Sequence, residues 1–304
     1  MGSTEDRLLG ALAVAGAASI WGTLGLFAKI LYAQGVSFEA LVAVRASVGW
    51  LAVLLFLLVG RGARSLRVAR RDLALLLPLG LVGVGGFYLL SFYTVRESTV
   101  GTAAILLYSA PAFVVVLARI FLRERLNAAK VSGLFLTAGG IFLVAGAYDP
   151  ANLEMSPDVL LTGLLSGLTY GLYAVLGRPL AGRLSPAVIL SYALAFGSAL
   201  LVIAAIPTLE TLAGLPAISY ALLLMLAVVH TALGFALYTF GISHLGAGRA
   251  AIVATIEPVV AGALGVALLG EDPTALKVLG GLLVLTGAVL AQLTPRKRAL
   301  RGRG

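Results

Sequence analysis

The sequence of 304 residues contains no cysteine, and only 12% of its residues are charged. The lack of cysteine excludes disulfide bonds, thiolate metal sites and thiol nucleophiles. A soluble domain carries about 25% charged and roughly 45–50% apolar residues. This chain is 60% hydrophobic, and its mean hydropathy is +1.05. Such a composition indicates a protein whose solvent is mostly lipid.

The net charge of +9 comes from basic residues in short segments between apolar runs. Two clusters, Arg61 to Arg71 and Arg296 to Arg303, flank apolar runs and contain no aromatic residue. Such clusters set membrane topology and attract anionic lipids. We therefore expect the bilayer and its anionic lipids to be partners of this chain, and no nucleic acid.

Ten apolar runs are long enough to span a bilayer, which requires about 20 mostly apolar residues. The first run is too long for the apolar part of a cleavable signal peptide. The predicted fold class is an all-α integral membrane protein with ten transmembrane helices. The expected spans are residues 8–31, 38–59, 73–94, 99–121, 128–147, 158–178, 187–206, 217–240, 248–270 and 275–293.

Orientation follows from the distribution of Lys and Arg, which are enriched in cytoplasmic loops. With the N-terminus in the cytoplasm, 18 of the 22 basic residues lie on the cytoplasmic side. The loop from Asp149 to Asp158 contains three acids and no base, which suits the outer side. We expect a multi-pass protein of the plasma (inner) membrane with both termini in the cytoplasm.

A shift of 147 residues superimposes the chain on itself, which indicates a duplicated unit. Five helices per unit is an odd number, so the two copies must insert with opposite orientation, as an inverted repeat. The predicted division is a first repeat at 1–148, a second repeat at 149–294 and a basic tail at 295–304. The matching pairs are Ala103 to Ile105 with Ala250 to Ile252, Pro111 with Pro258, Glu124 with Glu271, Lys130 with Lys277, Gly133 with Gly280, and Gly140 with Gly287.

Ten spans in a 5+5 inverted repeat resemble the drug/metabolite transporter superfamily, in particular its EamA family. The motifs that carry the resemblance are Trp21-Gly22 with Lys29, Arg45 in the second span, Ala-x-x-Leu-x-x-x-x-Pro in the fourth span followed by Glu124 and Gly133, and Glu257-Pro258 in the ninth span followed by Gly270-Glu271 and Gly280. The resemblance implies a carrier of small organic solutes, often an exporter of amino acids or other metabolites. One branch of the family exports aromatic amino acids.

Glu257 is the one acid well inside a predicted span, about 15 Å from the cytoplasmic start of its helix. A carboxylate near mid-membrane is costly and by default marks a functional site. Pro258 and its repeat mate Pro111 lack an N–H and are expected to break their helices. The alternative is that Glu257 only ties helices together, through Arg45 or a tyrosine hydroxyl.

Further candidate binding residues are Arg45, which could hold a carboxylate, and His230, which could relay a proton with Glu257. Arg45 could equally be a structural partner of Glu257 or snorkel to the interface, and His230 could be a neutral link between helices. Trp21, Tyr108 and Tyr170 are predicted near mid-membrane, where they could line an amphipathic cavity or simply pack in the core. Lys29 is expected to snorkel at the outer end of the first span.

The predicted function is secondary transport, as an exporter, of a small organic metabolite such as an amino acid by alternating access. The alternatives are a multidrug efflux carrier or an integral membrane enzyme. The sequence predicts no catalytic residue, metal site or cofactor, and a monomer or homodimer. The distance between Arg45 and Glu257 separates two of these functions, because efflux of cations requires an unpaired acid.

Overall fold

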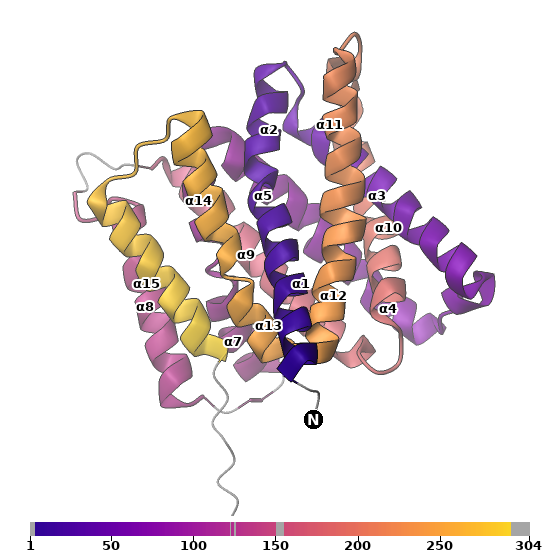
Figure 1. The fold of residues 1–304 in the computed structure, drawn as a ribbon, viewed down its shortest axis with the longest axis horizontal. Coiled ribbons are helices and arrows are strands. Elements are labelled where there is room, and N and C mark those ends of the chain that lie inside the picture. Colours follow the sequence, from indigo (N-terminus) through magenta and orange to yellow (C-terminus); the bar gives the residue numbers. More distant parts are fainter. Residues whose placement is uncertain (1–3, 122, 125, 150–154, 293–304) are drawn as a thin grey trace, which may run out of the picture.

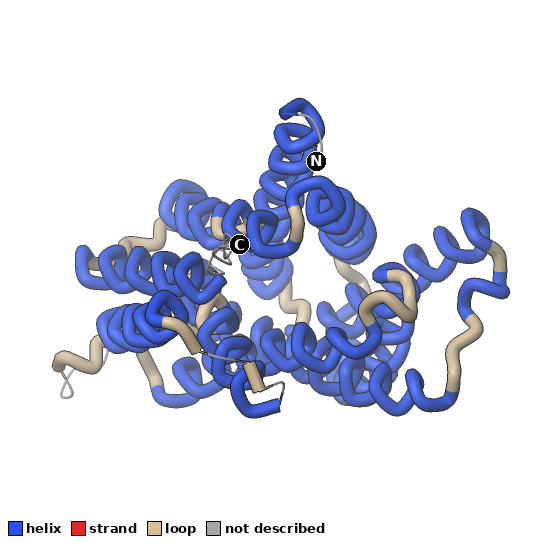
Figure 2. Tube along the Cα trace, turned by 90° about the horizontal axis from the view of Figure 1, so that it is seen from below, coloured by secondary structure: helices blue, strands red, loops and turns tan. Residues whose placement is uncertain are grey.

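The computed structural model describes residues 4–121, 123–124, 126–149 and 155–292. Within these ranges the chain is helical, and Figure 2 shows helices joined by short loops without a strand. The predicted basic tail at 295–304 lies outside the described residues, as do Arg125 and most of the loop between Asp149 and Asp158.

The ten predicted spans are confirmed as apolar helical segments. Nine of those described have the length and hydropathy to cross a membrane, and the tenth, α8, is a shorter apolar helix. The α-helices are α1 (Thr4–Gly22), α2 (Leu24–Ala33), α3 (Phe38–Arg61), α4 (Arg70–Gly80), α5 (Phe87–Glu97), α6 (Val100–Leu107), α7 (Ala110–Phe121), α8 (Ala128–Val144), α9 (Pro157–Gly177), α10 (Pro186–Ala205), α11 (Ala217–Ala227), α12 (Gly234–Leu245), α13 (Ala247–Val253), α14 (Ile256–Leu269) and α15 (Ala275–Gln292). Two π-helical segments, η2 (Leu81–Gly86) and η5 (Val228–Leu233), and three 3-10 segments, η1 (Ala63–Leu66), η3 (Arg178–Leu180) and η4 (Ile206–Leu212), complete the elements.

Several helices begin at a side chain that accepts a hydrogen bond from a free backbone N–H of the first turn. Ser37 caps α3 by accepting from the Ala40 N–H at 3.1 Å. Thr99 caps α6 in the same way through Thr102, and Asn127 caps α8 through Lys130. These caps set the points at which the second, fourth and fifth spans start.

The bundle has two faces, which we name by the chain termini. The proximal face carries the start of α1 and the end of α15, and the distal face carries the end of α2 and the start of α11 (Figure 1). The first span runs from the proximal to the distal face, whereas α9, which opens the second half, runs from the distal to the proximal face. The two five-helix halves are therefore inverted, as predicted.

Glycines shared by the two halves form the contact between the fifth and tenth spans. Helices α8 and α15 lie side by side at one edge of the bundle (Figure 1). A Cβ added to Gly133 would lie 2.8 Å from the Gly287 carbonyl, and one added to Gly280 would lie 2.6 Å from the Gly140 carbonyl. Small residues let helix backbones approach closely in lipid. Gly133 thus contacts Gly287, and their repeat mates, Gly280 and Gly140, contact each other in the same way across the pseudo-two-fold axis. This symmetric contact explains why both halves have these glycines.

Breaks in the helices occur at equivalent positions of the two halves. The fourth span is interrupted between α6 and α7, ahead of Pro111, and the ninth between α13 and α14, ahead of Pro258. The predicted proline breaks are thus present in both halves. The π segments η2 and η5 also begin 147 residues apart. Such π turns often accompany functional sites.

Apolar side chains cover the outside of the bundle as well as its core. Phe56 on α3 is 67% exposed and Phe135 on α8 is 75% exposed. In water such side chains would be costly, whereas lipid solvates them as readily as a protein core does. The outward-facing phenylalanines and leucines therefore mark the surface that contacts the bilayer.

Candidate functional site

The first and eighth spans are joined where both depart from regular α-helix. The first span is interrupted at Thr23, between α1 and α2, and His230 lies in the π segment η5. The Trp21 indole N–H donates to the His230 carbonyl at 2.9 Å, and the Thr23 hydroxyl lies 2.8 Å from His230 Nε2. Gly234 leaves room for the indole, because a Cβ there would lie 2.7 Å from Trp21 Nε1.

His230 is buried at 3% exposure, and its remaining ring nitrogen lies 3.4 Å from the Met225 carbonyl. These contacts match a histidine that links two helices, which was one of the two predicted roles. The other role, a proton relay with Glu257, has no direct hydrogen bond between the two side chains to support it.

Tyr108 joins the fourth and ninth spans at their breaks. Its hydroxyl lies 2.6 Å from the Ala254 carbonyl and 3.1 Å from Glu257 Oε2. Ala254 is four residues before Pro258, so the proline leaves its carbonyl without the usual intrahelical donor. The Ala254 carbonyl instead accepts from the Glu257 N–H at 3.0 Å and from the Tyr108 hydroxyl, which also reaches the Glu257 carboxyl.

Glu257 is held by this tyrosine rather than by a cation. None of the ion pairs formed by the described residues involves Glu257. Gly22 packs closely on this turn, since a Cβ there would lie 2.8 Å from the Glu257 carbonyl. The hydroxyls of Tyr108, Tyr170 and Tyr238 all lie within electrostatic range of the carboxyl. Of these three phenols, Tyr108 is the one that hydrogen-bonds the carboxyl.

Arg45 is a second charge without an opposite partner. It is 5% exposed, and its Nε makes no hydrogen bond. The guanidinium stacks over the Tyr88 ring at 4.4 Å and the Phe92 ring at 5.3 Å, as cations do on aromatic faces. It lies within electrostatic range of Glu257 but forms no ion pair with it. Of the roles predicted for Arg45, the ion pair with Glu257 is not formed among the described residues.

Tyr170 lies in the middle of α9 and is 44% exposed, although its ring contacts Phe87 at a centroid distance of 5.3 Å. Trp21 contacts Tyr238 in a similar way, at 5.2 Å. Lys29 donates to the Arg96 carbonyl at the distal face, which agrees with its predicted place at a helix end.

Sequence reasoning missed Thr23, and it placed Tyr88 and Tyr238 only in a general cluster of aromatic residues in the spans. Thr23 contacts His230, and Tyr238 contacts Trp21. Neither residue is charged or a proline, so neither gave a sequence signal of its own. The motif Trp21-Gly22 was the available signal for a special turn in the first span. The stacking of Arg45 on Tyr88 depends on how α3 meets α5, which no local pattern shows.

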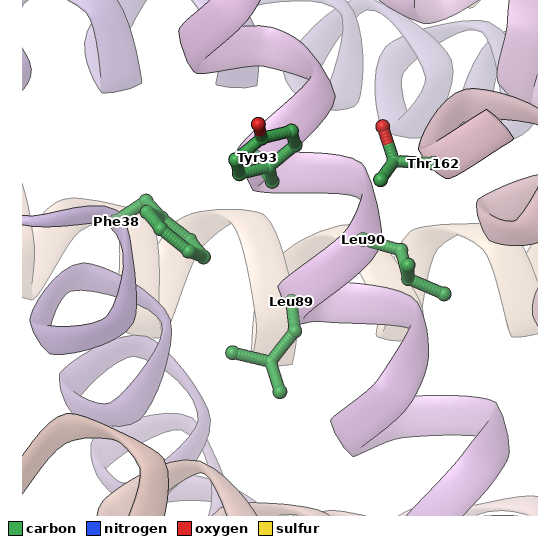
Figure 3. Close-up of a pocket in the computed structure, with 5 residues that line it drawn as sticks. All are labelled: Phe38, Leu89, Leu90, Tyr93 and Thr162. Atoms are coloured by element: carbon green, nitrogen blue, oxygen red, sulfur yellow. The ribbon is translucent and has the colours of Figure 1, made fainter. Parts of the chain in front are cut away.

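The described surface also has two recesses, both near the distal face and away from Glu257. The first, of about 260 Å³, is lined by apolar side chains from three spans, and Figure 3 shows the Phe38 ring across from Leu89, with the Tyr93 and Thr162 hydroxyls at one end. The second, of about 330 Å³, is partly polar and includes Thr102 and Lys277 in its wall. Neither contains a candidate residue predicted from the sequence.

Comparison with known proteins decides the family. The model of the EamA-like transporter family matches residues 8–146 and again residues 159–293. The chain belongs to the EamA-like transporter family. It is a multi-pass membrane protein of a transporter family, as the resemblance of the motifs implied.

Relatives of this EamA-like chain carry transporter names. An uncharacterized transporter of Archaeoglobus fulgidus is 32% identical over 93% of this chain and 96% of its own. The inner membrane transporter YicL of Salmonella typhimurium is 27% identical, with 98% and 99% covered. A protein of Streptantibioticus cattleyicolor named "Probable terminal-alkyne amino-acid exporter" is 27% identical over 74% of each chain.

A solved crystal structure has the same fold with a TM-score of 0.63 at 20% identity, and the match covers 95% of this chain and 97% of the other. This likeness concerns the fold alone. It agrees with the ten-helix, two-repeat architecture of the EamA-like family.

Proposed function

We propose that this EamA-like protein exports a small zwitterionic metabolite, of the amino-acid class, across the plasma membrane by alternating access. The observation that carries the proposal is that Glu257, beside the break of the ninth span, and Arg45, in the unbroken helix α3, both lack an opposite charge. An unpaired Glu257 alone would suit a cation equally well, so the unpartnered Arg45 is what favours a zwitterion. Glu257 has no cation beside it, and Arg45 has a buried Nε without an acceptor. An uncompensated charge in the membrane interior is costly, so a solute that neutralises both charges is the natural ligand.

An α-amino acid offers an ammonium to Glu257 and a carboxylate to Arg45. The guanidinium binds a carboxylate through two parallel N–H···O hydrogen bonds. Its stacking on Tyr88 fixes the plane in which these N–H donors lie. Tyr108 and Tyr170 provide aromatic surface for an apolar side chain near the same acid. The relative named as an amino-acid exporter adds support from outside the chain.

The test is counterflow of a panel of labelled amino acids into proteoliposomes that contain the purified protein, with and without a pH gradient. Hydrogen bonds to charged groups contribute about 1.5–3 kcal/mol, so Glu257→Gln and Arg45→Gln should each lower transport roughly tenfold or more. Glu210→Gln, a change of the same chemistry at the distal η4 segment, is the matched control and should leave transport unchanged.

Two results would contradict the proposal. Transport by Glu257→Gln at the wild-type rate throughout pH 5 to 8 would remove the acid from the mechanism. Transport of organic cations that depends on Glu257 and is indifferent to Arg45→Gln would instead support multidrug efflux, because only the acid is then required. The enzyme alternative is disfavoured by the transporter names of the family and of its relatives.

A further inference from the structure

The third and eighth spans each change their packing partner at a π segment. Before η2 the third span, as α4, packs mainly against α10, and after η2, as α5, it packs mainly against α9. The eighth span does the same at η5, because α11 packs mainly against α3 and α12 mainly against α1. Helices α3, α4 and α10 gather at the edge of the bundle opposite α8 and α15 (Figure 1). Each π segment therefore lies at the junction between two groups of helices.

Glycines seat the first halves of these spans, α4 and α11, on the seventh and second spans. A Cβ added to Gly197 of α10 would lie 3.0 Å from the Gly80 carbonyl at the end of α4. A Cβ added to Gly49 of α3 would lie at the same distance from the Ala227 carbonyl at the end of α11. Gly80 and Ala227 are repeat mates. The two contacts are equivalent, and small residues allow this close approach of helix backbones in lipid.

Buried polar bonds anchor the other ends of α4 and α11 to the same two spans. Asp72, at the start of α4, accepts a hydrogen bond from the Arg183 guanidinium in the loop ahead of α10. Its repeat mate Ser219, at the start of α11, donates to the Gln34 side chain in the loop ahead of α3. Asp72 is 5% exposed and Ser219 is 0% exposed. Because a buried polar group is costly without its partner, each first half is held at both of its ends.

Different contacts hold the second halves, α5 and α12. Thr94 of α5 donates to the Thr162 hydroxyl of α9 at 3.0 Å. A Cβ added to Gly241 of α12, the repeat mate of Thr94, would lie 2.8 Å from the Gly10 carbonyl of α1. Helix α14, which contains Glu257, also packs on α1. The second halves thus belong with the first, sixth and ninth spans.

We propose that η2 and η5 are the hinges about which two bodies of this carrier move. The first body consists of α3 and α10 with α4 and α11, and the second contains α1, α5, α9, α12 and α14. A π turn has wider hydrogen-bonded rings than the α-helix on either side, and such turns are one of the identifiable causes of helix bending. The inference rests on the alternating access in the proposed function and assigns the positions at which the backbone bends.

The two charges of the candidate site lie on different bodies, Arg45 on the first and Glu257 on the second. Tyr88, on which Arg45 stacks, is part of α5 and therefore of the second body. A change of the angle at η2 moves this ring relative to the guanidinium. A zwitterion that binds both Arg45 and Glu257 bridges the two bodies, so its binding favours one hinge angle over the other.

The absence of cysteine allows three spin-label positions to test this division. Ala74→Cys lies on α4, Glu97→Cys on α5 and Ile203→Cys on α10, and all three positions are exposed. The labels are introduced two at a time, and distance distributions are measured by pulsed electron resonance on the full chain in nanodiscs. No solute is added, so the readout does not depend on transport.

The pair on positions 74 and 203 lies within the first body and should give one narrow distribution. The pair on 74 and 97 spans η2, and the pair on 97 and 203 joins the two bodies. Both of these pairs should give distributions that are broad or have two maxima, because α5 moves relative to α4 and α10.

Gly86→Ala stiffens η2 without crowding it, since the nearest atom to a Cβ there is the Leu81 carbonyl oxygen at 3.7 Å. Alanine favours regular helix more strongly than glycine, so the ratio of the two populations for the Ala74 and Glu97 pair should change about fivefold towards the longer distance. Gly139→Ala is the matched control in the unbroken helix α8, where a Cβ meets nothing within 4 Å. It should leave all three distributions unchanged.

Three results would overturn the proposal. The pair on 74 and 203 could be as broad as the pair on 74 and 97, or the pair on 74 and 97 could be as narrow as the pair on 74 and 203. An unchanged population ratio in Gly86→Ala would reject η2 as the place of bending. Counterflow on the same variants separates this inference from the proposed solute. Hinge motion without amino-acid transport would reject the solute and leave the hinges standing, and transport with narrow distributions for all pairs would do the reverse.

Discussion

The fourth and ninth spans are repeat mates that share a backbone and differ in chemistry. Both are interrupted one turn before a proline, at Tyr108 in the fourth span and at Ala254 and Thr255 in the ninth. Position 110 holds alanine where its mate, 257, holds glutamate. Tyr108 reaches across to the other span, whereas its mate Thr255 donates to the nearby Ile252 carbonyl.

This difference separates what duplication preserved from what diverged afterwards. The prolines and the facing glycines serve the fold, and both copies need them. In the proposed function the acid and the phenol serve one site between the copies, which needs each group only once. In a duplicated carrier, residues that break the internal symmetry are thus better candidates for recognising solute than residues that obey it.

The sharpest comparison of the two halves concerns orientation. Ser65 in η1 and Ala213 after η4 lie at equivalent points of the two repeats but on opposite faces. In the cysteine-free chain, a cysteine at Ala213 should react with an impermeant thiol reagent added outside intact cells. A cysteine at Ser65 should react only after the membrane is opened. The reverse pattern would place the termini outside the cytoplasm.

The next largest effect is expected at the glycine contact between α8 and α15. Gly133→Leu and Gly280→Leu, which are repeat mates, should each destabilise the protein by about 1–3 kcal/mol, because the added side chain meets backbone that cannot yield easily. Thermal unfolding in detergent measures this. Gly139→Leu is the control, since a Cβ there meets nothing within 4 Å.

The two glycine variants should be destabilised by similar amounts, because each glycine meets the carbonyl of the opposite helix. A loss confined to one of them would mean that the contact is not symmetric in the membrane. A comparable loss in Gly139→Leu would show instead that α8 tolerates no bulk on any side.

The sequence predicted the ten spans, their inversion and the proline breaks, because hydropathy and self-similarity record these features directly. It did not predict the π segments η2 and η5, since a change in the register of backbone hydrogen bonds has no residue signature of its own.

The sequence indicated which residues are candidates for the site but not which residues they contact. Glu257 and Tyr108 were both expected near mid-membrane, and the structure joins them. The roles considered for Arg45 did not include its stacking on Tyr88, because this contact depends on the approach of α3 to α5. Charge pairing between distant spans cannot be read from one sequence, since many arrangements satisfy the same hydropathy.

The smallest effect we predict distinguishes the two prolines. Pro258→Ala restores an N–H that can bond the Ala254 carbonyl. The Tyr108 hydroxyl and the Glu257 N–H already donate to this carbonyl, so a third donor should displace the phenol from its place beside Glu257. Pro111→Ala restores a bond in the fourth span, where no acid follows the break. One hydrogen bond contributes a net free energy of about 1 kcal/mol, which corresponds to about a fivefold change. Transport should therefore fall about fivefold in Pro258→Ala and less in Pro111→Ala. Counterflow rates, normalised to the amount of folded protein, make the comparison. Equal losses would mean that both breaks serve only the motion of the helices, and the asymmetry of the site would then have to lie elsewhere.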